Sequence, residues 1–218
     1  MEERDKLESL LNKAFISFDQ KNYIEAEKLY CKVLISAKDR FNELYKQALY
    51  GLGFTKTLSK QYKKARECYF KLLSYAIEEE NKEDESILYH QLCMVEREAG
   101  NYDIALQYLK KEYDLILKVF KDKNMYLSAN YYENGYINLL KGDCNKAKVL
   151  LEKSLYYAEK SEDKVCVACA FRGLGEVYIS KKETNKALEY LNKSEEVFKY
   201  LGDDIGAREV EGLKEKLV

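Results

Sequence analysis

The sequence predicts an all-α fold built from five stacked helix pairs. The first observation is an alanine that recurs at intervals of 39 to 42 residues, at Ala26, Ala65, Ala105, Ala147 and Ala187. The second is a small residue twelve positions before each of these, at Ala14, Gly53, Cys93, Gly135 and Gly175. The third is a set of apolar residues at helical spacing around these positions. A fixed period of this length indicates a stack of like units.

Small residues at both recurring positions allow two antiparallel helices to approach closely. Because one pair leaves an apolar face uncovered, each pair must stack on a neighbour. The short turns inside the pairs read QKN, SKQ, AGN, KGD and KKE, and the polar links between pairs offer Asp and Asn as helix N-caps. We expect helix pairs over residues 5–38, 40–78, 83–120, 123–160 and 163–201.

The last segment, residues 203–217, differs from the repeats because no partner helix follows it. Its apolar residues, Ile205, Val210, Leu213 and Leu217, are separated by charged ones. Such an amphipathic segment is typical of a capping helix that covers the end of the last repeat. We expect one elongated domain over residues 1–218.

The frame around the repeated alanines resembles the tetratricopeptide repeat. The segments NYIEAEKLY, QYKKARECY and NYDIALQYL place an aromatic residue three positions before the alanine and an apolar one four after it, and LYGLG and FRGLG end at Gly53 and Gly175. The resemblance covers nearly the whole chain and implies a right-handed α-α superhelix, or solenoid, whose first helices line the concave side.

Two departures from the family pattern concern tryptophan and proline. The family's tryptophan is replaced by Leu, Tyr or Phe, and the chain has no proline. Without that stop signal we expect longer second helices and hence a period near 40. Long repeats of this kind are similar to those of bacterial peptide-sensing regulators. Repeat one starts within the first ten residues, so we expect the sensor half of such a regulator or a stand-alone adaptor.

The composition argues against several partners. Charged residues make up 34% of the chain with a net charge of −1, so we expect no direct contact with nucleic acid. The N-terminus lacks the apolar region of a secretory signal. The longest apolar run, residues 165–171, is far shorter than the ~20 residues that span a bilayer. We therefore expect a cytoplasmic protein without a membrane partner.

Neither a metal site nor a catalytic site is predicted. Cys166 and Cys169 form a lone C-x-x-C inside a predicted helix, and His90 is the only histidine. A structural zinc site would lack ligands, so we interpret the six cysteines as packing residues. The sequence contains no phosphate-binding loop, dinucleotide-binding glycine motif or nucleophile elbow. We expect no catalytic residues, no cofactor and no enzyme activity.

The repeat register places candidate binding residues on the first helices, three before, one after and four after each small residue. The candidates are Leu11, Phe15, Phe18, Tyr50, Phe54, His90, Met94, Arg97, Tyr132, Tyr136, Arg172 and Glu176. Gly51 and Gly173 would leave the floor of the groove open to a ligand backbone. Aromatic and Met side chains suit an apolar peptide. The alternative is that these tyrosines reflect the general composition of such repeats.

Three asparagines, Asn130, Asn134 and Asn138, recur at every fourth residue and therefore share one helix face. Their amides either hold the backbone of a bound peptide or form a hydrogen-bond ladder between helices.

The leading functional hypothesis is a non-enzymatic module that binds a peptide or protein segment in the concave groove, as the sensor or adaptor of a bacterial regulatory system. The alternative is a structural scaffold that self-associates as a homo-oligomer with no groove ligand.

Overall fold

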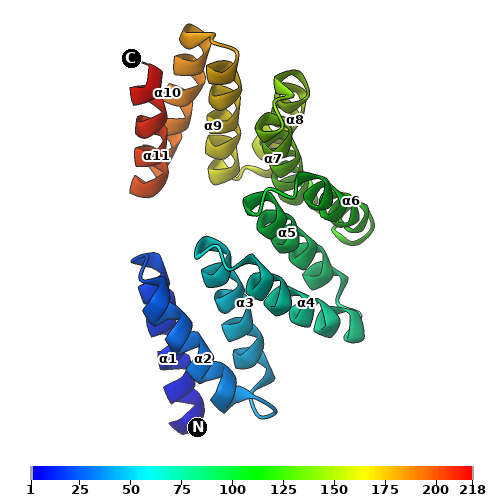
Figure 1. Cartoon of the computed structure of the whole chain (residues 1–218). Helices are drawn as coiled ribbons and strands as arrows, with labels where there is room; N and C mark the ends of the chain where they lie inside the picture. Colours follow the sequence, from blue (N-terminus) through cyan, green and yellow to red (C-terminus); the bar gives the residue numbers. More distant parts are fainter. Residues whose placement is uncertain (1, 218) are drawn as a thin grey trace. The chain divides into compact units, whose positions relative to one another are not determined.

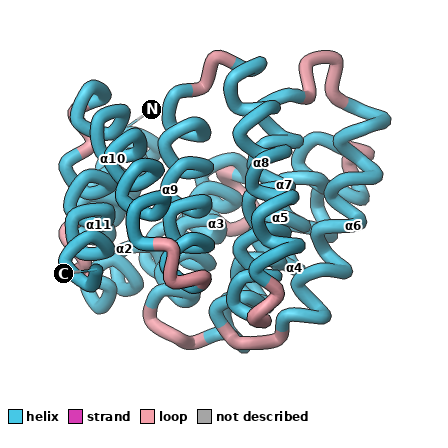
Figure 2. Tube along the Cα trace, turned by 90° about the horizontal axis from the view of Figure 1, so that it is seen from above, coloured by secondary structure: helices cyan, strands magenta, loops and turns pink. Residues whose placement is uncertain are grey.

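The computed structural model describes residues 2–217, so Met1 and Val218, the ends of the predicted domain, lie outside the described residues. Within this range every regular element is helical and the connections are short, which confirms the predicted all-α fold (Figures 1 and 2). The helices are α1 (Glu2–Asp19), α2 (Tyr23–Ala37), α3 (Asn42–Leu58), α4 (Tyr62–Glu78), α5 (Lys82–Glu98), α6 (Tyr102–Val119), α7 (Asn124–Leu140), α8 (Cys144–Ser161), α9 (Lys164–Ser180), α10 (Thr184–Leu201) and α11 (Asp204–Lys214), followed by the 3₁₀ turn η1 (Glu215–Leu217).

The chain divides into two compact units, Met1–Tyr108 and Leu109–Val218, and the boundary falls within α6. The first unit contains α1 to α5 and the start of α6. The second contains the rest of α6, α7 to α11 and η1. The single domain over residues 1–218 stays a prediction.

The small residues at the repeat positions allow the close helix approach that the sequence predicts. All five recurring alanines are fully buried. A Cβ added to Gly53 would lie 2.8 Å from the Tyr69 ring, and one added to Gly175 would lie 2.7 Å from Leu191. Contacts under 3.0 Å require a neighbour to move, so these two positions accept only glycine without repacking.

Asn and Asp side chains cap helices from three of the links between pairs, as predicted, and also from two turns inside pairs. Asn22, Asn81, Asp143, Asp163 and Asp203 each accept a hydrogen bond from a backbone N–H in the first turn of the following helix. Such side-chain acceptors satisfy donors that a helix start leaves unpaired. Both helices of a pair contribute to the long repeat period, since α7 has 17 residues and the second helix α8 has 18.

Two buried ion pairs connect successive repeats in the first unit. Lys56, near the C-terminal end of α3, pairs with Glu27 of α2, and its Nζ also donates to Gln61 Oε1 at 3.0 Å. Glu96 of α5 pairs with Arg66 of α4, with both carboxylate oxygens accepting at 2.5 and 2.9 Å. The two pairs occupy the same repeat positions, three after the small residue and one after the alanine, with the charges exchanged.

The capping helix α11 packs against α10 in the second unit, as predicted. Val210 is fully buried, Ala207 is buried, and Leu213 is partly buried against the same apolar cluster. Ile205 was expected in this contact and is 48% exposed instead. It lies in the first turn of α11, where Gly206 faces the helix interface and approaches the Phe198 ring.

Candidate functional site

In the first unit the structure brings three of the predicted aromatic residues together. The Phe18 and Phe54 rings meet edge to face at a centroid distance of 6.1 Å, and Tyr50 lies 5.9 Å from Phe54. All three are partly buried against the apolar core, as is Leu11. Phe15 instead points to solvent and is 62% exposed. The aromatic side chains therefore contribute to packing between repeats as well as to the surface.

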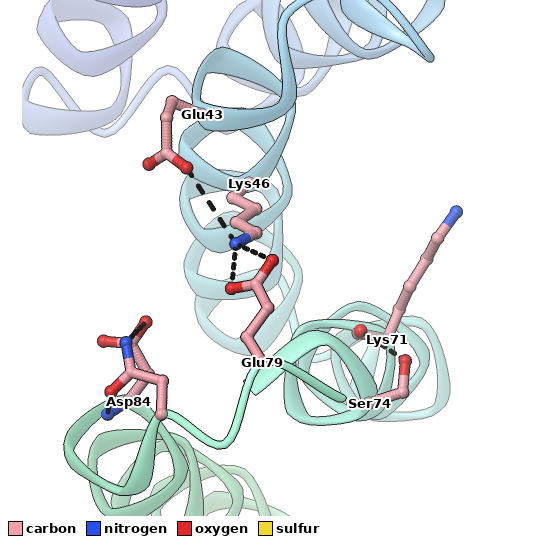
Figure 3. A network of polar contacts seen from close by, with 7 residues as sticks. Glu43, Lys46, Lys71, Ser74, Glu79 and Asp84 are labelled. Carbon is pink, nitrogen blue, oxygen red and sulfur yellow. Dashed lines mark hydrogen bonds and ion pairs between the residues drawn. The ribbon is translucent and has the colours of Figure 1, made fainter. Parts of the chain in front are cut away.

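Tyr50 also lines a hollow of about 200 Å³ between α3, α4 and α5. Glu43, Lys46 and Asp84 are among its lining residues, and Figure 3 shows the polar contacts around them. Lys46 Nζ lies 2.6 and 2.7 Å from the two carboxylate oxygens of Glu79, and this hydrogen bonding raises the pKa of Lys46. The positive charge of Lys46 is thus already paired with Glu79.

The predicted residues of the third repeat, His90, Met94 and Arg97, are partly buried on α5. The Arg97 Nη2 atom lies 3.0 Å from a carboxylate oxygen of its neighbour Glu98. None of these three is among the residues that line the hollow next to Tyr50.

The second unit contains a larger hollow, of about 380 Å³, between α7, α9 and α11. Three predicted residues, Tyr136, Arg172 and Glu176, share it with residues of the capping helix and of the 3₁₀ turn. The full lining is Tyr136, Arg172, Glu176, Arg208, Glu209, Gly212, Leu213 and Lys216. The register therefore located one wall of this hollow, from the first helices of repeats four and five.

Arg172 lies at the centre of the polar contacts in this hollow. Its Nη2 donates to the Tyr132 hydroxyl at 3.0 Å, and its Nη1 donates to Glu209. Its Nε is buried without a hydrogen-bond partner and lies 3.9 Å from a carboxylate oxygen of Glu176, beyond hydrogen-bond distance. The Tyr132 ring stacks on Tyr136 with a centroid distance of 6.0 Å.

The charge balance around Arg172 follows from burial. Burial raises the pKa of the Tyr132 phenol, so this residue contacts Arg172 as a neutral hydroxyl. Glu209 is 58% exposed, and water weakens its pairing with the guanidinium. Arg172 therefore presents a planar cation whose counter-charges are an exposed carboxylate and one beyond hydrogen-bond distance.

The asparagine stripe forms internal hydrogen bonds. Asn130 is buried, and its amide donates to the Leu109 carbonyl and to Glu112 Oε2, both at 2.9 Å. Asn138 is buried too and donates to the backbone and side-chain oxygens of Asn134 at 2.7 and 2.9 Å. The Asn130 contacts join α7 to α6 and favour the structural alternative for this residue. The Asn138 contacts lie within α7 and form no ladder between helices.

The two glycines expected to open a groove floor have another role. A Cβ on Gly51 would lie 2.4 Å from the Tyr30 ring of the preceding repeat, and one on Gly173 would lie 2.8 Å from Leu151. Their backbones are approached by side chains of the neighbouring helices, so the expectation that they face a ligand is wrong.

Sequence reasoning missed the wall that the capping helix contributes. Arg208, Glu209 and Lys216 were not among the candidate binding residues, although the segment has a small residue, Gly212, between them. The sequence feature that could have indicated this wall is the group of charged residues around a glycine in the short terminal helix.

The cysteines show no sign of activation. Burial raises the pKa of Cys68 to about 11 and that of Cys166 to about 12, so both thiols stay protonated near neutral pH. Across residues 2–217 no three His, Cys, Asp or Glu side chains are grouped so as to hold a metal ion. Over the same range, no helix combines the length and apolar character needed to span a membrane.

Comparisons with known proteins agree with this architecture. A tetratricopeptide repeat family model matches residues 125–199. No curated protein matches the sequence. A solved Rap protein, complexed with competence and sporulation factor, is similar with a TM-score of 0.78 and 16% identity, covering 92% of this chain and 56% of that one. This chain thus spans little more than half of the Rap protein.

Two further solved structures are similar over most of this chain. A thermophilic tetratricopeptide repeat protein of Thermus thermophilus has a TM-score of 0.68 and 18% identity, covering 97% of this chain and 98% of that one. A signal-transduction ATPase of Pyrococcus horikoshii with a tetratricopeptide repeat sensor has a TM-score of 0.71 and 18% identity, covering 95% and 32%. The chain therefore has the tetratricopeptide-repeat fold, and its residues 125–199 are recognisable as tetratricopeptide repeats from sequence.

Proposed function

We propose that the chain is a non-enzymatic module that binds a peptide or a protein segment in the hollow between α7, α9 and α11. The observation that carries this proposal is that Tyr136, Arg172 and Glu176, selected from the repeat register, line one hollow of about 380 Å³. A volume of that size falls in the range typical of ligand sites. The mixture of a stacked tyrosine pair, Leu213 and several charged groups suits a segment with both apolar and polar side chains.

The comparisons support a sensor or adaptor role. The similar Rap structure contains a bound competence and sporulation factor, and in the Pyrococcus horikoshii protein the repeats form the sensor of an ATPase. By analogy, this chain would recognise a segment and transmit its presence to a partner protein. We expect such a module in the cytoplasm, without direct nucleic-acid or membrane contacts.

The test uses peptides selected by phage display from a random 12-residue library on the immobilised full-length chain. Tyr136→Ala should weaken the selected peptides at least tenfold, because an aromatic anchor in a binding site contributes about 2 kcal/mol or more. The matched control is Tyr156→Ala, an exposed tyrosine of α8 that does not line the hollow. Failure to select any peptide, or equal effects of the two variants, would contradict the proposal.

The second candidate function, a self-associating scaffold, is favoured by exposed apolar residues on α2. Ile24 and Ile35 lie about three helical turns apart there, and both are exposed. Solution mass by light scattering distinguishes the candidates. A defined oligomer that dissociates in an Ile24→Glu, Ile35→Glu double variant, together with no peptide selection, would support the scaffold.

A further inference from the structure

The Arg172 guanidinium has hydrogen-bonding capacity that the protein does not use. A guanidinium presents five N–H donors in a planar fork that matches a carboxylate with two parallel bonds. Here the Tyr132 hydroxyl takes one donor, Glu209 takes another, and the buried Nε takes part in no hydrogen bond. Nη1 and Nη2 each carry two hydrogens, so each keeps one donor that these two contacts do not use, and the two nitrogens together form one fork.

The counter-ion on the other side of the hollow is a replaceable one. Glu209 belongs to the capping helix and contacts Arg172 through a single nitrogen, Nη1, while most of its own side chain remains in water. Glu209 therefore contacts Arg172 only at Nη1. The Nε atom lies 3.9 Å from a carboxylate oxygen of Glu176. An exposed ion pair of this kind is weak, and an incoming carboxylate competes with it easily.

The surroundings favour an incoming anion. Three cationic side chains, those of Arg172, Arg208 and Lys216, line the hollow against two carboxylates. If Glu209 is displaced, only Glu176 remains among the lining carboxylates opposite the three cations. Cations that converge on one hollow attract anionic groups and orient them toward it.

We infer that Arg172 is the recognition site for a carboxylate of the bound segment, and that Glu209 of the capping helix occupies this site in the free protein. The inference rests on the proposed function and adds the chemistry of the ligand group and an internal competitor. The incoming carboxylate accepts hydrogen bonds from the two terminal nitrogens, Nη1 and Nη2, in place of Glu209. Tyr132 keeps the other hydrogen of Nη2 and so holds the guanidinium plane. Glu209 then moves to solvent.

The direct test needs no selected peptide. The side-chain Nε–Hε resonance of Arg172 is followed by nitrogen-proton NMR of the full chain during titration with small probes. N-acetylglutamate α-amide offers only a side-chain carboxylate, N-acetylalanine offers only a terminal carboxylate, and N-acetylglutamine α-amide offers neither. We expect at least one carboxylate probe to shift the Arg172 resonance in a saturable way, and the neutral probe to leave it in place. The probe that binds more tightly identifies the source of the carboxylate.

The competitor is tested with Glu209→Gln, and Glu211→Gln is the matched control on the same helix. Glu211 is also exposed and lies 3.4 Å from Lys199 of α10, away from Arg172. Since an exposed ion pair is worth up to ~1 kcal/mol, Glu209→Gln should tighten carboxylate binding by about two- to fivefold, and Glu211→Gln should not change it. Equal affinities in the two variants would overturn the role of Glu209.

The outcomes separate the two proposals. If selected peptides depend on Tyr136 but no carboxylate probe shifts Arg172, and replacing each Asp or Glu of those peptides with its amide changes nothing, the proposed function stands and the inference fails. If carboxylate probes bind at Arg172 but no peptide depends on Tyr136, the recognition site stands and the peptide-binding function fails.

Discussion

Arg66 and Glu96 form a buried ion pair, and we predict that replacing Arg66 and replacing Glu96 destabilise the protein to different extents. The Glu96 side chain is 4% exposed, whereas the Arg66 side chain is 27% exposed. Glu96 also accepts a hydrogen bond from Asn101 at 2.7 Å. Arg66→Met therefore leaves a buried carboxylate with one neutral donor, while Glu96→Gln leaves a cation that water can reach.

The magnitudes follow from these environments. Removing one partner of a buried ion pair costs about 3–5 kcal/mol when the other charge stays buried. Asn101 remains next to Glu96, so we expect the lower end, about 3 kcal/mol, for Arg66→Met. For Glu96→Gln we expect about 1–2 kcal/mol, because a neutral amide replaces the carboxylate and Arg66 becomes hydrated.

The assay is urea unfolding of the full chain, with hydrogen exchange over residues 62–101 to assign the loss to this pair. Lys193→Met is the matched control, since Lys193 and Glu189 form an exposed pair at 2.7 Å and its loss should cost about 0.5 kcal/mol or less. A loss for Arg66→Met no greater than that for Glu96→Gln would refute the reasoning.

The same pair has a pH signature. Burial disfavours the charged form of Glu96, but the hydrogen bonds from Arg66 and Asn101 outweigh it and lower the pKa. A lowered carboxyl pKa contributes stability above the unfolded-state value, about 4.3, and this stability is lost as the pH falls through the folded-state pKa. The difference between wild type and Arg66→Met should therefore be largest near pH 7 and shrink below about pH 4.

Three further predictions concern the last repeat and the turn between α3 and α4. Truncation after Leu201 should uncover Phe198 and cost about 3 kcal/mol, seen as faster hydrogen exchange in α10, and unchanged exchange would show that residues 203–217 are a tail. Lys60→Gly, at φ 59°, should raise the unfolding free energy by about 1 kcal/mol, while Glu67→Gly, at an exposed position inside α4, should lower it by about 1 kcal/mol, and equal shifts in thermal unfolding would contradict this. Hydrogen bonds from two lysines lower the pKa of Glu195 to about 2, so its stabilising contribution should disappear between about pH 4.3 and pH 2, and melting curves of Glu195→Gln should lack this component.

The helix arrangement was predictable because its causes are local. Small residues set the helix crossings, and Asn and Asp mark helix starts, so the predicted pairs differ from the observed ones by about three residues or fewer. Asn81 and Asp163, for example, cap α5 and α9 from the links between pairs in which caps were expected. Ile205 was wrongly expected to contact α10. The sequence does not show to which side a residue in the first turn of a helix points.

The candidate site was only half predictable because it joins residues distant in sequence. The repeat register identified Tyr136, Arg172 and Glu176, which lie on the first helices of successive repeats. Glu209 belongs to no repeat, and its contact with Arg172 depends on how α11 packs on α10. The buried ion pairs, Lys56 with Glu27 and Arg66 with Glu96, could not be predicted for the same reason. Each charged residue is buried against a residue of the neighbouring repeat, and the sequence does not show this contact.

Site-specific photo-crosslinking measures most directly whether a peptide occupies the hollow between α7, α9 and α11. The photoreactive residue p-benzoylphenylalanine is placed at Tyr136, or at Tyr156 as the control, and the protein is irradiated with a selected, labelled peptide. The account predicts crosslinking from position 136 that an unlabelled copy of the peptide suppresses, and little from position 156. Crosslinking that is equal at the two positions, or absent at 136 while the peptide still binds, would contradict it.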